Sequence, residues 1–348
     1  MGDVAGHQMV QAMGTASAVF KAKQSTLEKL EGIGAFRAKA VKSFEGFAAL
    51  EEEVAFIEKF KIQPLFITDE AYPQKLLHCY DAPLLLFYRG TANLNAEKMI
   101  AVVGTRSATD YGRQFTEKLV EDVAPLGITI TSGLAFGIDA VAHRAALKNN
   151  LPTVAVVGHG LAKIYPPEHA GLAKEMISNN GGLLTEFFSH TKPDKHNFPL
   201  RNRIVAGLCD ATVVVETAVK GGSMITAKLA DAYNRDVFAL PGRTTDKAST
   251  GCNYLIRHNK AVMITSANDL LETMGWKPVQ KAAKIQRSLF LNLTADEQVL
   301  CKLMQDKSTV GIDELNGSSG LTSSAVAAAL LSLELQGVVQ SLPGKLYS

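Results

Sequence analysis

The feature that most constrains the fold is a regular alternation of short apolar runs with amphipathic stretches between residues 99 and 239. Short apolar runs separated by helical patterns are typical of βαβ units, in which parallel strands are buried on both faces. The predicted strands span residues 99–103, 128–131, 153–157, 182–185, 211–215 and 236–239. The predicted helices span residues 112–124, 139–148, 168–179, 202–207 and 223–234. Because such crossovers share one hand, the pattern predicts an α/β fold with an extended, Rossmann-like, doubly wound and mostly parallel sheet, whose ligand site lies at the carboxyl ends of the strands.

Composition limits what such a sheet can bind. The chain has 348 residues, of which 47% are hydrophobic, so it can bury a sizeable core over two or three domains. Its 36 lysines and arginines nearly balance 34 acidic residues, and a net charge of +2 creates no overall field that would hold a polyanion. Any nucleic-acid site must therefore be a local patch.

Cysteine spacing and hydropathy indicate the compartment. The four cysteines are far apart, and none belongs to a CxxC pair: Cys79, Cys209, Cys252 and Cys301. This spacing argues against structural zinc and against a disulfide framework, and it fits a reducing cytosol. No apolar run approaches the ~18 residues that would span a bilayer. We therefore expect a soluble, cytoplasmic protein with no membrane partner.

Two of the predicted strand ends carry residues suited to an anion. Gly104 allows close backbone approach, while Thr105 and Arg106 offer a hydroxyl and a planar guanidinium that fit phosphate. The second end contains Ser132 and Gly133, and the amide groups that follow can cradle an anion at a helix start. The alternative, that both are simply tight strand-to-helix turns, stays open.

A third strand end is followed by Gly221, Gly222 and Ser223 at a predicted helix start. The glycines supply free amide groups, and Ser223 can act as a helix cap or as a phosphate ligand. Gly-Lys-Ser/Thr is absent, so Walker A chemistry is not expected. No loop has GxGxxG with an acidic residue about 20 positions later, and no cofactor is predicted.

The fourth segment, residues 192–203, concentrates positive charge in a nearly neutral chain. Five basic or potentially basic groups lie within it: Lys192, Lys195, His196, Arg201 and Arg203. Together with Asn197 and the aromatic Phe198 they form a surface suited to single-stranded nucleic acid, because phosphates are neutralised and a base stacks on the ring. The alternative is a solvated helix start with Phe198 in the core. Arg201 and Arg203 are two residues apart, so we expect one to face the groove and the other to form an internal ion pair.

Asp139 and His143 are spaced four residues apart on a predicted helix, which would permit a metal pair. No third ligand has a compatible spacing, and Asp139 is well placed to accept hydrogen bonds at its own helix start. We therefore predict a structural role for both residues and no metal. Cys252 has no neighbouring histidine or cysteine, so a reactive nucleophile is not expected there.

Read in order, these loops resemble the DNA-processing protein A family, also called DprA or Smf. The resemblance rests on five ordered motifs between about residues 60 and 275: Gly104-Thr105-Arg106, Ser132-Gly133 through Gly137-Ile138-Asp139 with Ala142-His143, Phe198-Pro199 with Arg201-Asn202-Arg203-Ile204, Gly221-Gly222-Ser223 with Thr226-Ala227, and Leu240-Pro241-Gly242. It implies a protein that binds single-stranded DNA without catalysis. Such proteins protect incoming strands during natural transformation and load the RecA recombinase, usually as dimers.

The resemblance also assigns roles to residues by position. The residues expected to bind DNA are Gly104, Thr105, Arg106, Ser132, Gly133, Lys195, Asn197, Phe198, Arg201, Arg203, Gly221, Gly222 and Ser223. The residues expected to be structural parts of the motifs are Gly137, Asp139, His143 and Thr226. Phe198 is the expected stacking platform. The dimer surface is expected around residues 213–233 and the strand that follows.

The flanks divide the chain further. Residues 1–60 are predicted to be a helical domain whose segment 30–40 resembles a helix-hairpin-helix in a SAM-like fold, and we expect this domain to be incomplete at its N-terminus. Residues 61–276 form the predicted DNA-binding domain, and residues 277–288 are polar and suit a linker. Residues 289–348 resemble a winged helix. Its candidate recognition helix, residues 323–335, has no lysine or arginine, so we expect it to contact protein rather than duplex DNA.

Two other functions remain open on the residues alone. A nucleotide-processing enzyme of the lysine-decarboxylase-like, phosphoribohydrolase type would use the same Gly-rich loops, with Glu216 as its acid. Against this, the Pro-Gly-Gly-x-Gly-Thr-x-x-Glu pattern of such enzymes is missing. A protein-interaction scaffold would use the basic loop to bind an acidic partner. Dependence on aromatic stacking would distinguish DNA binding from the scaffold.

Overall fold

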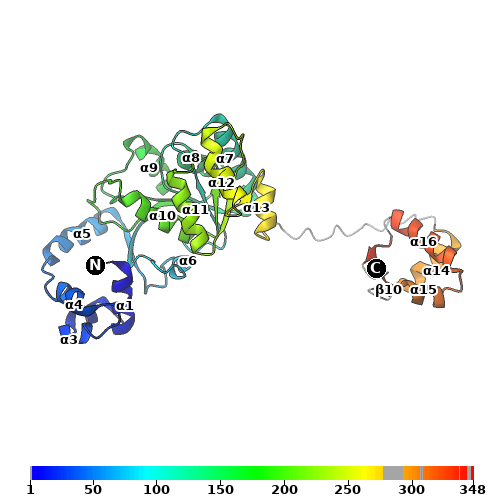
Figure 1. Cartoon of the computed structure of the whole chain (residues 1–348), viewed down its shortest axis with the longest axis horizontal. Coiled ribbons are helices and arrows are strands. Elements are labelled where there is room, and N and C mark those ends of the chain that lie inside the picture. The colour runs from blue at the N-terminus through cyan, green and yellow to red at the C-terminus, as the bar shows by residue number, and fades with distance from the viewer. Residues whose placement is uncertain (1, 277–292, 306, 308, 337, 343–345) are drawn as a thin grey trace. The chain divides into compact units, whose positions relative to one another are not determined.

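The computed structural model describes residues 2–276, 293–305, 307, 309–336, 338–342 and 346–348. The chain divides into two compact units, Met1–Trp276 and Lys277–Ser348. The predicted linker, residues 277–288, lies outside the described residues. Figure 1 shows the elements of each unit, coloured along the chain.

The first unit is built on a nine-stranded sheet with the order β1-β2-β6-β5-β4-β3-β7-β8-β9. The six strands predicted from the apolar runs are all present and pair in parallel with one another. Their bounds are β3 Met99–Val103, β4 Thr129–Ser132, β5 Thr153–Val156, β6 Gly181–Thr185, β7 Ala211–Val214 and β8 Asp236–Ala239. The predicted Rossmann-like, mostly parallel sheet is therefore confirmed.

Three further strands extend the sheet at its edges. β1 (Gln63–Phe66) and β2 (Leu85–Gly90) add an antiparallel pair beyond β6, and β9 (Val262–Met263) adds a parallel strand beyond β8. β1 contains Pro64, which a sheet tolerates on an edge strand because proline donates no ladder hydrogen bond. Side chains of β9 are exposed, so that strand lacks a buried apolar run.

Helices cover both faces of the sheet. Their bounds are α6 Gln74–Leu77, α7 Asp110–Val123, α8 Ile138–Lys148, α9 Ala170–Ser178, α10 Asn197–Leu208, α11 Gly222–Ala232, α12 Thr250–Arg257 and α13 Ala267–Thr273. Short 3-10 turns occupy Ala124–Leu126, Pro167–His169 and Lys247–Ser249. None of the described helices combines the length and the apolar character that a membrane crossing requires.

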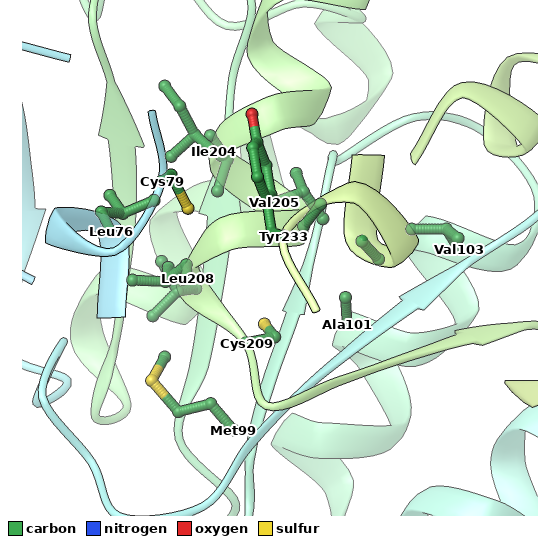
Figure 2. Packing of buried hydrophobic residues seen from close by; sticks show 14 of the residues in the cluster. Leu76, Cys79, Met99, Ala101, Val103, Ile204, Val205, Leu208, Cys209 and Tyr233 are labelled. Atoms are coloured by element: carbon green, nitrogen blue, oxygen red, sulfur yellow. The ribbon is translucent and has the colours of Figure 1, made fainter. Parts of the chain in front are cut away.

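Alternate side chains of strand β3 pack into the hydrophobic cores on the two faces of the sheet. Ile100 and Val102 belong to a core that includes side chains of α7, α8 and α13. Ala101 and Val103 point to the other face, into a core formed with α10, α11 and α12. Figure 2 shows this second core, with Met99, Ala101 and Val103 near Ile204, Val205 and Leu208 of α10. Burial on both faces explains why the strand is a continuous apolar run.

The N-terminal region is helical, as predicted. Its helices are α1 Asp3–Met13, α2 Ala16–Lys21, α3 Gln24–Leu27, α4 Gly34–Lys42 and α5 Phe47–Phe60. Helices α3 and α4 are joined by a turn in which Gly32 and Gly34 have φ of +75° and +61°, a region that favours glycine. The region has a small core of its own around Met9, Leu27 and Ala38, and it belongs to the same compact unit as the sheet (Figure 1).

The second unit has the arrangement of a winged helix. Its helices are α14 Ala295–Met304, α15 Ile312–Ser318 and α16 Ser323–Leu335, and its three short strands are β10 Val310–Gly311, β11 Ser341–Leu342 and β12 Leu346–Tyr347. Leu300, Leu315 and Leu330 lie at the centre of its core. Helix α16 leaves Leu331 and Leu335 exposed to solvent, and its surface carries no lysine or arginine.

Candidate nucleic-acid interface

A cavity of about 690 Å³ opens at the carboxyl ends of the parallel strands. It is lined by the loops that follow β3, β4 and β7, together with the starts of α10 and α11. The chain continues from β3 to β4 on one side and returns to β7 on the other, so this is the point at which the strand order reverses. Crevices at such reversal points are the usual ligand sites of open α/β sheets.

Most of the residues predicted to bind DNA line this one cavity. They are Gly104, Thr105, Arg106, Gly133, Lys195, Phe198, Arg201, Gly221, Gly222 and Ser223. Asp139 and Thr226, predicted as structural residues, also line it. Segments separated by more than 100 residues are thus brought together in space.

Three predicted DNA-binding residues do not line the cavity. Ser132 is fully buried and its hydroxyl donates to the carbonyl of Val102, 2.6 Å away, which joins β4 to β3. Asn197 is the first residue of α10 and lies outside the lining. Arg203 is absent from the lining, and its guanidinium contacts acidic side chains elsewhere. Of the structural residues, Gly137 and His143 also lie outside the lining.

Arg203 forms the internal ion pair that the sequence assigns to one of the two neighbouring arginines. Its guanidinium contacts the carboxylates of Glu186 and Asp3, the latter at 2.8 Å, and donates to the carbonyl of Asp81. The side chain is mostly buried. Its placement among the DNA-contacting residues is therefore not supported by the geometry, because both partners compete with any phosphate.

Arg201 is the arginine that lines the cavity, and its guanidinium is buried and held by a hydrogen bond. Its Nη1 donates to the carbonyl of Val156 at 2.6 Å, and only 6% of the residue is exposed. A Cβ at position 133 would lie 1.8 Å from Nη1, so the close approach of Arg201 requires Gly133. Burial lowers the pKa of Arg201 to about 10, and the nearby Asp139 carboxylate acts in the opposite direction.

The amide groups of the loop after β4 were predicted to cradle an anion, but two of them bind a side chain of the protein instead. Asp139 Oδ2 accepts hydrogen bonds from the amides of Gly133 and Ala135, at 3.1 and 3.3 Å. These two amides therefore hold the loop in place and are not available to an anion. Burial raises the pKa of Asp139, whereas the Arg201 charge and the loop amides lower it. Gly137 has a φ of +77°, and a Cβ there would lie 2.1 Å from the carbonyl of Thr105.

His143 is enclosed in the core behind this loop. Its Nδ1 lies 2.7 Å from the hydroxyl of Thr153, which itself donates to the carbonyl of Ile130. His143 Nδ1 must therefore be the donor in this pair. Burial lowers the pKa of His143 to about 3, so the ring is neutral. In the part of the chain that the structure describes, no three His, Cys, Asp or Glu side chains gather as a metal site.

The ring of Phe198 is half-buried at the cavity wall. A Cβ at position 158 would lie 3.0 Å from the ring, so Phe198 packs over Gly158. The guanidinium carbon of Arg106 lies 5.6 Å from the ring centroid, within the range of a cation–π contact. Lys195 lines the cavity two residues before α10 begins. The cavity thus contains one aromatic ring with a cation over it, Arg106, and a second exposed cation, Lys195, in its lining.

Several lining residues are not among those predicted to bind DNA. They include Tyr165, Asp194, Asn202 and Ile225. Asp194 is the acid among them, and its carboxylate accepts a hydrogen bond from the amide of His196 at 2.8 Å, which orders the turn before α10. Asn202 reaches the carbonyl of Gly222 at 3.5 Å and so connects α10 with α11. Gly158 and Gly160 follow β5 in the loop that contains Tyr165, but Tyr165 itself lies five residues after Gly160, so the strand-end glycines do not single it out.

Glu216 and Cys252 serve the core. The amide of Thr109 donates to the Glu216 carboxylate at 3.0 Å, and so does the hydroxyl of Thr109. A Cβ at Gly112 would lie 2.5 Å from the Glu216 carboxyl group, so this acid is packed against the start of α7 and is absent from the cavity lining. Burial raises the pKa of Cys252 to about 12, which leaves a thiol of low reactivity.

Comparison with known proteins places the chain in a family. Residues 63–275 match the family DNA recombination-mediator protein A, and residues 291–345 match the DprA winged helix domain. Protein Smf of Synechocystis sp. is 34% identical over 94% of this chain and 90% of its own length. The DNA processing protein DprA of Streptococcus pneumoniae is 42% identical over 62% of this chain and 75% of its own.

Solved structures agree with this result. The X-ray structure of DNA processing protein A from Streptococcus pneumoniae has a TM-score of 0.69 at 34% identity, covering 78% of this chain and 92% of that one. DNA processing protein A from Helicobacter pylori, described for its single-stranded DNA binding mode, has a TM-score of 0.56 at 30% identity, covering 62% and 96%. With the reversal-point cavity and the C-terminal winged helix, these matches show that the chain belongs to the DNA recombination-mediator protein A (DprA/Smf) family.

Proposed function

We propose that this protein binds single-stranded DNA, without sequence preference, in the cavity above β3, β4 and β7. The observation that carries the proposal is that Arg106, Lys195 and Phe198 line one cavity, with the Arg106 guanidinium within cation–π distance of the Phe198 ring. A ring flanked by cations stacks a base and neutralises adjacent phosphates, and both interactions are available to any unpaired nucleotide. The relative from Helicobacter pylori, described for single-stranded DNA binding, supports the same substrate class.

The shape of the site favours an unpaired strand over a duplex. Stacking needs the flat face of a base, which pairing and stacking within a duplex conceal. Arg201, which has a carbonyl partner and lies near the Asp139 carboxylate, supplies fixed positive charge beneath the strand without moving toward it. We therefore assign phosphate contact to the more exposed Arg106 and Lys195, and background electrostatics to Arg201.

We propose binding without catalytic turnover. The phosphoribohydrolase alternative needs an acid in the cavity, and its candidate, Glu216, is occupied by Thr109 at the start of α7. Incubation of the protein with AMP-class nucleotides, followed by chromatography, separates the two functions: binding alone releases no base. If the wild type releases free base and the Glu216→Gln variant does not, the enzyme function is favoured.

The wider role that we propose is the one the family resemblance implies. The protein would protect incoming strands during natural transformation and load the RecA recombinase onto them, acting in the cytoplasm as a homodimer. Membership in a family of recombination mediators supports this role. Light scattering of the purified chain tests the dimer. RecA filament assembly on DNA pre-bound by the protein tests the loading activity.

Replacing Arg106 by alanine is expected to weaken binding and to reduce its salt dependence. Loss of one phosphate contact to a single strand lowers the slope of log K against log salt by about 0.7. Fluorescence anisotropy of a labelled oligothymidine, titrated at several salt concentrations, measures both quantities. Lys174→Ala removes an exposed cation on α9 outside the cavity lining and serves as the matched control. An Arg106→Ala slope equal to that of the control would rule out the phosphate contact.

A further inference from the structure

A second aromatic side chain lies beside Phe198. Tyr165, in the loop between β5 and α9, lines the same cavity and is 43% exposed. The two ring centroids are 5.9 Å apart, and the ring planes are inclined by 32°. This is a close pairing of partly exposed rings at the mouth of a site that already carries cations.

The loop holds Tyr165 in this position through a buried histidine. The Tyr165 amide donates to His159 Nε2 at 3.2 Å, and His159 Nδ1 lies 2.8 Å from the carbonyl of Gly160. The carbonyl of His159 in turn accepts a hydrogen bond from the hydroxyl of Thr185, at 2.9 Å. The backbone that carries the ring is thus tied to β6, which limits the entropy lost when a ligand stacks on it.

The core does not require Tyr165. Its ring is exposed to 43%, and it belongs to none of the hydrophobic clusters of the described residues. A large apolar ring kept partly in water, on an anchored backbone and at a cavity mouth, is suited to a planar ligand.

We propose that Tyr165 and Phe198 form one two-ring platform that receives the same unpaired base. Their centroid separation lies within the ~4.5–7 Å of interacting aromatic pairs, so the two rings adjoin, and we expect a base stacked on Phe198 to contact Tyr165 as well. The proposal rests on the proposed function, because it names a second residue of that site and the group that it contacts. Tyr165 acts through its ring, so its hydroxyl group is not required.

Replacing Tyr165 by alanine tests the platform. We expect oligothymidine to bind roughly 5-fold or more weakly, and Tyr165→Phe to bind as the wild type does, because stacking on one ring is worth a factor of this order. Tyr165→Leu, which keeps apolar volume without a ring, should resemble Tyr165→Ala. Phe136→Ala is the matched control, because Phe136 is 42% exposed on the neighbouring loop and does not line the cavity.

The double variant Tyr165→Ala/Phe198→Ala tests whether the base is shared. If both rings contact one base, the double variant binds less weakly than the product of the two single effects predicts. If the fold losses of affinity in the two single variants multiply in the double variant, the rings contact separate bases. That result would overturn the shared platform. If Tyr165→Ala binds oligothymidine with wild-type affinity while Phe198→Ala binds it more weakly, Tyr165 has no role in binding. The proposed function would then still stand. Wild-type affinity in both Phe198→Ala and Arg106→Ala would remove the proposed function itself.

Discussion

Phe198→Ala is expected to bind oligothymidine about 5- to 150-fold more weakly than the wild type, which corresponds to ~1–3 kcal/mol of stacking per base. The reason is that Phe198 supplies the ring at the cavity wall, bordered by Arg106 at 5.6 Å. The ring is half-buried in the first turn of α10, so its removal leaves the core of the sheet intact. Anisotropy titration at fixed salt measures the loss.

Phe188→Ala is the matched control for this prediction. Phe188 is a phenylalanine with 49% exposure in the loop after β6, outside the cavity lining. Its removal should leave the affinity within twofold of the wild type. If both variants lose affinity equally, the effect reflects general destabilisation, and the assignment of Phe198 to the DNA is then contradicted.

Arg201→Met is expected to lower the free energy of unfolding by about 1–3 kcal/mol, because it leaves the buried Val156 carbonyl without its hydrogen-bond donor and removes the positive charge near a buried carboxyl group. Asp139 is that group: burial raises its pKa, and the Arg201 charge is the largest influence that opposes this rise. Urea unfolding followed by the fluorescence of Trp276 measures the change. Trp276 is the single tryptophan of the chain and packs against the core of the sheet, so its signal reports on the first unit.

Two further variants separate the charge effect from lost packing. Arg201→Met/Asp139→Asn removes the stranded charge and should recover part of the stability. Lys118→Met disrupts an exposed ion pair on α7 and should leave the unfolding midpoint unchanged, because exposed pairs contribute little. A variant Arg201→Met as stable as the wild type would show that Asp139 is protonated or that water reaches it.

The parallel strands could be predicted to within one residue at most ends, because burial on both faces makes each an apolar run. β1 was not predicted because it is an edge strand with mostly exposed side chains and contains Pro64. β2 was also not predicted, although its residues Leu85 to Tyr88 form a short apolar run in a strand with no exposed residue. β9 has two residues and exposed side chains, which leaves no pattern to detect. The sequence therefore predicts the centre of the sheet well and its edges poorly.

For the site as well, features set by neighbouring residues could be predicted, whereas contacts with residues distant in the sequence could not. Glycines and cations in the segments between strands and the following helices predicted much of the cavity lining, because the carboxyl ends of parallel strands meet at one edge. The spacing of Arg201 and Arg203 predicted that one faces inward, but the choice depends on Glu186 and Asp3, which are distant in sequence. Likewise, only the folded loop reveals that Asp139 occupies the amides of Gly133 and Ala135.

Photocrosslinking tests the central claim most directly. A 4-thiothymidine-substituted oligothymidine is bound to the full chain at low salt, irradiated, and the crosslinked peptides are identified by mass spectrometry. We expect crosslinks in the cavity segments that contain Arg106, Tyr165, Lys195 to Asn202, and Gly221 to Thr226. Crosslinks confined to residues 2–60 or to the winged-helix unit would contradict the account, since they would place the strand away from the end of the parallel sheet.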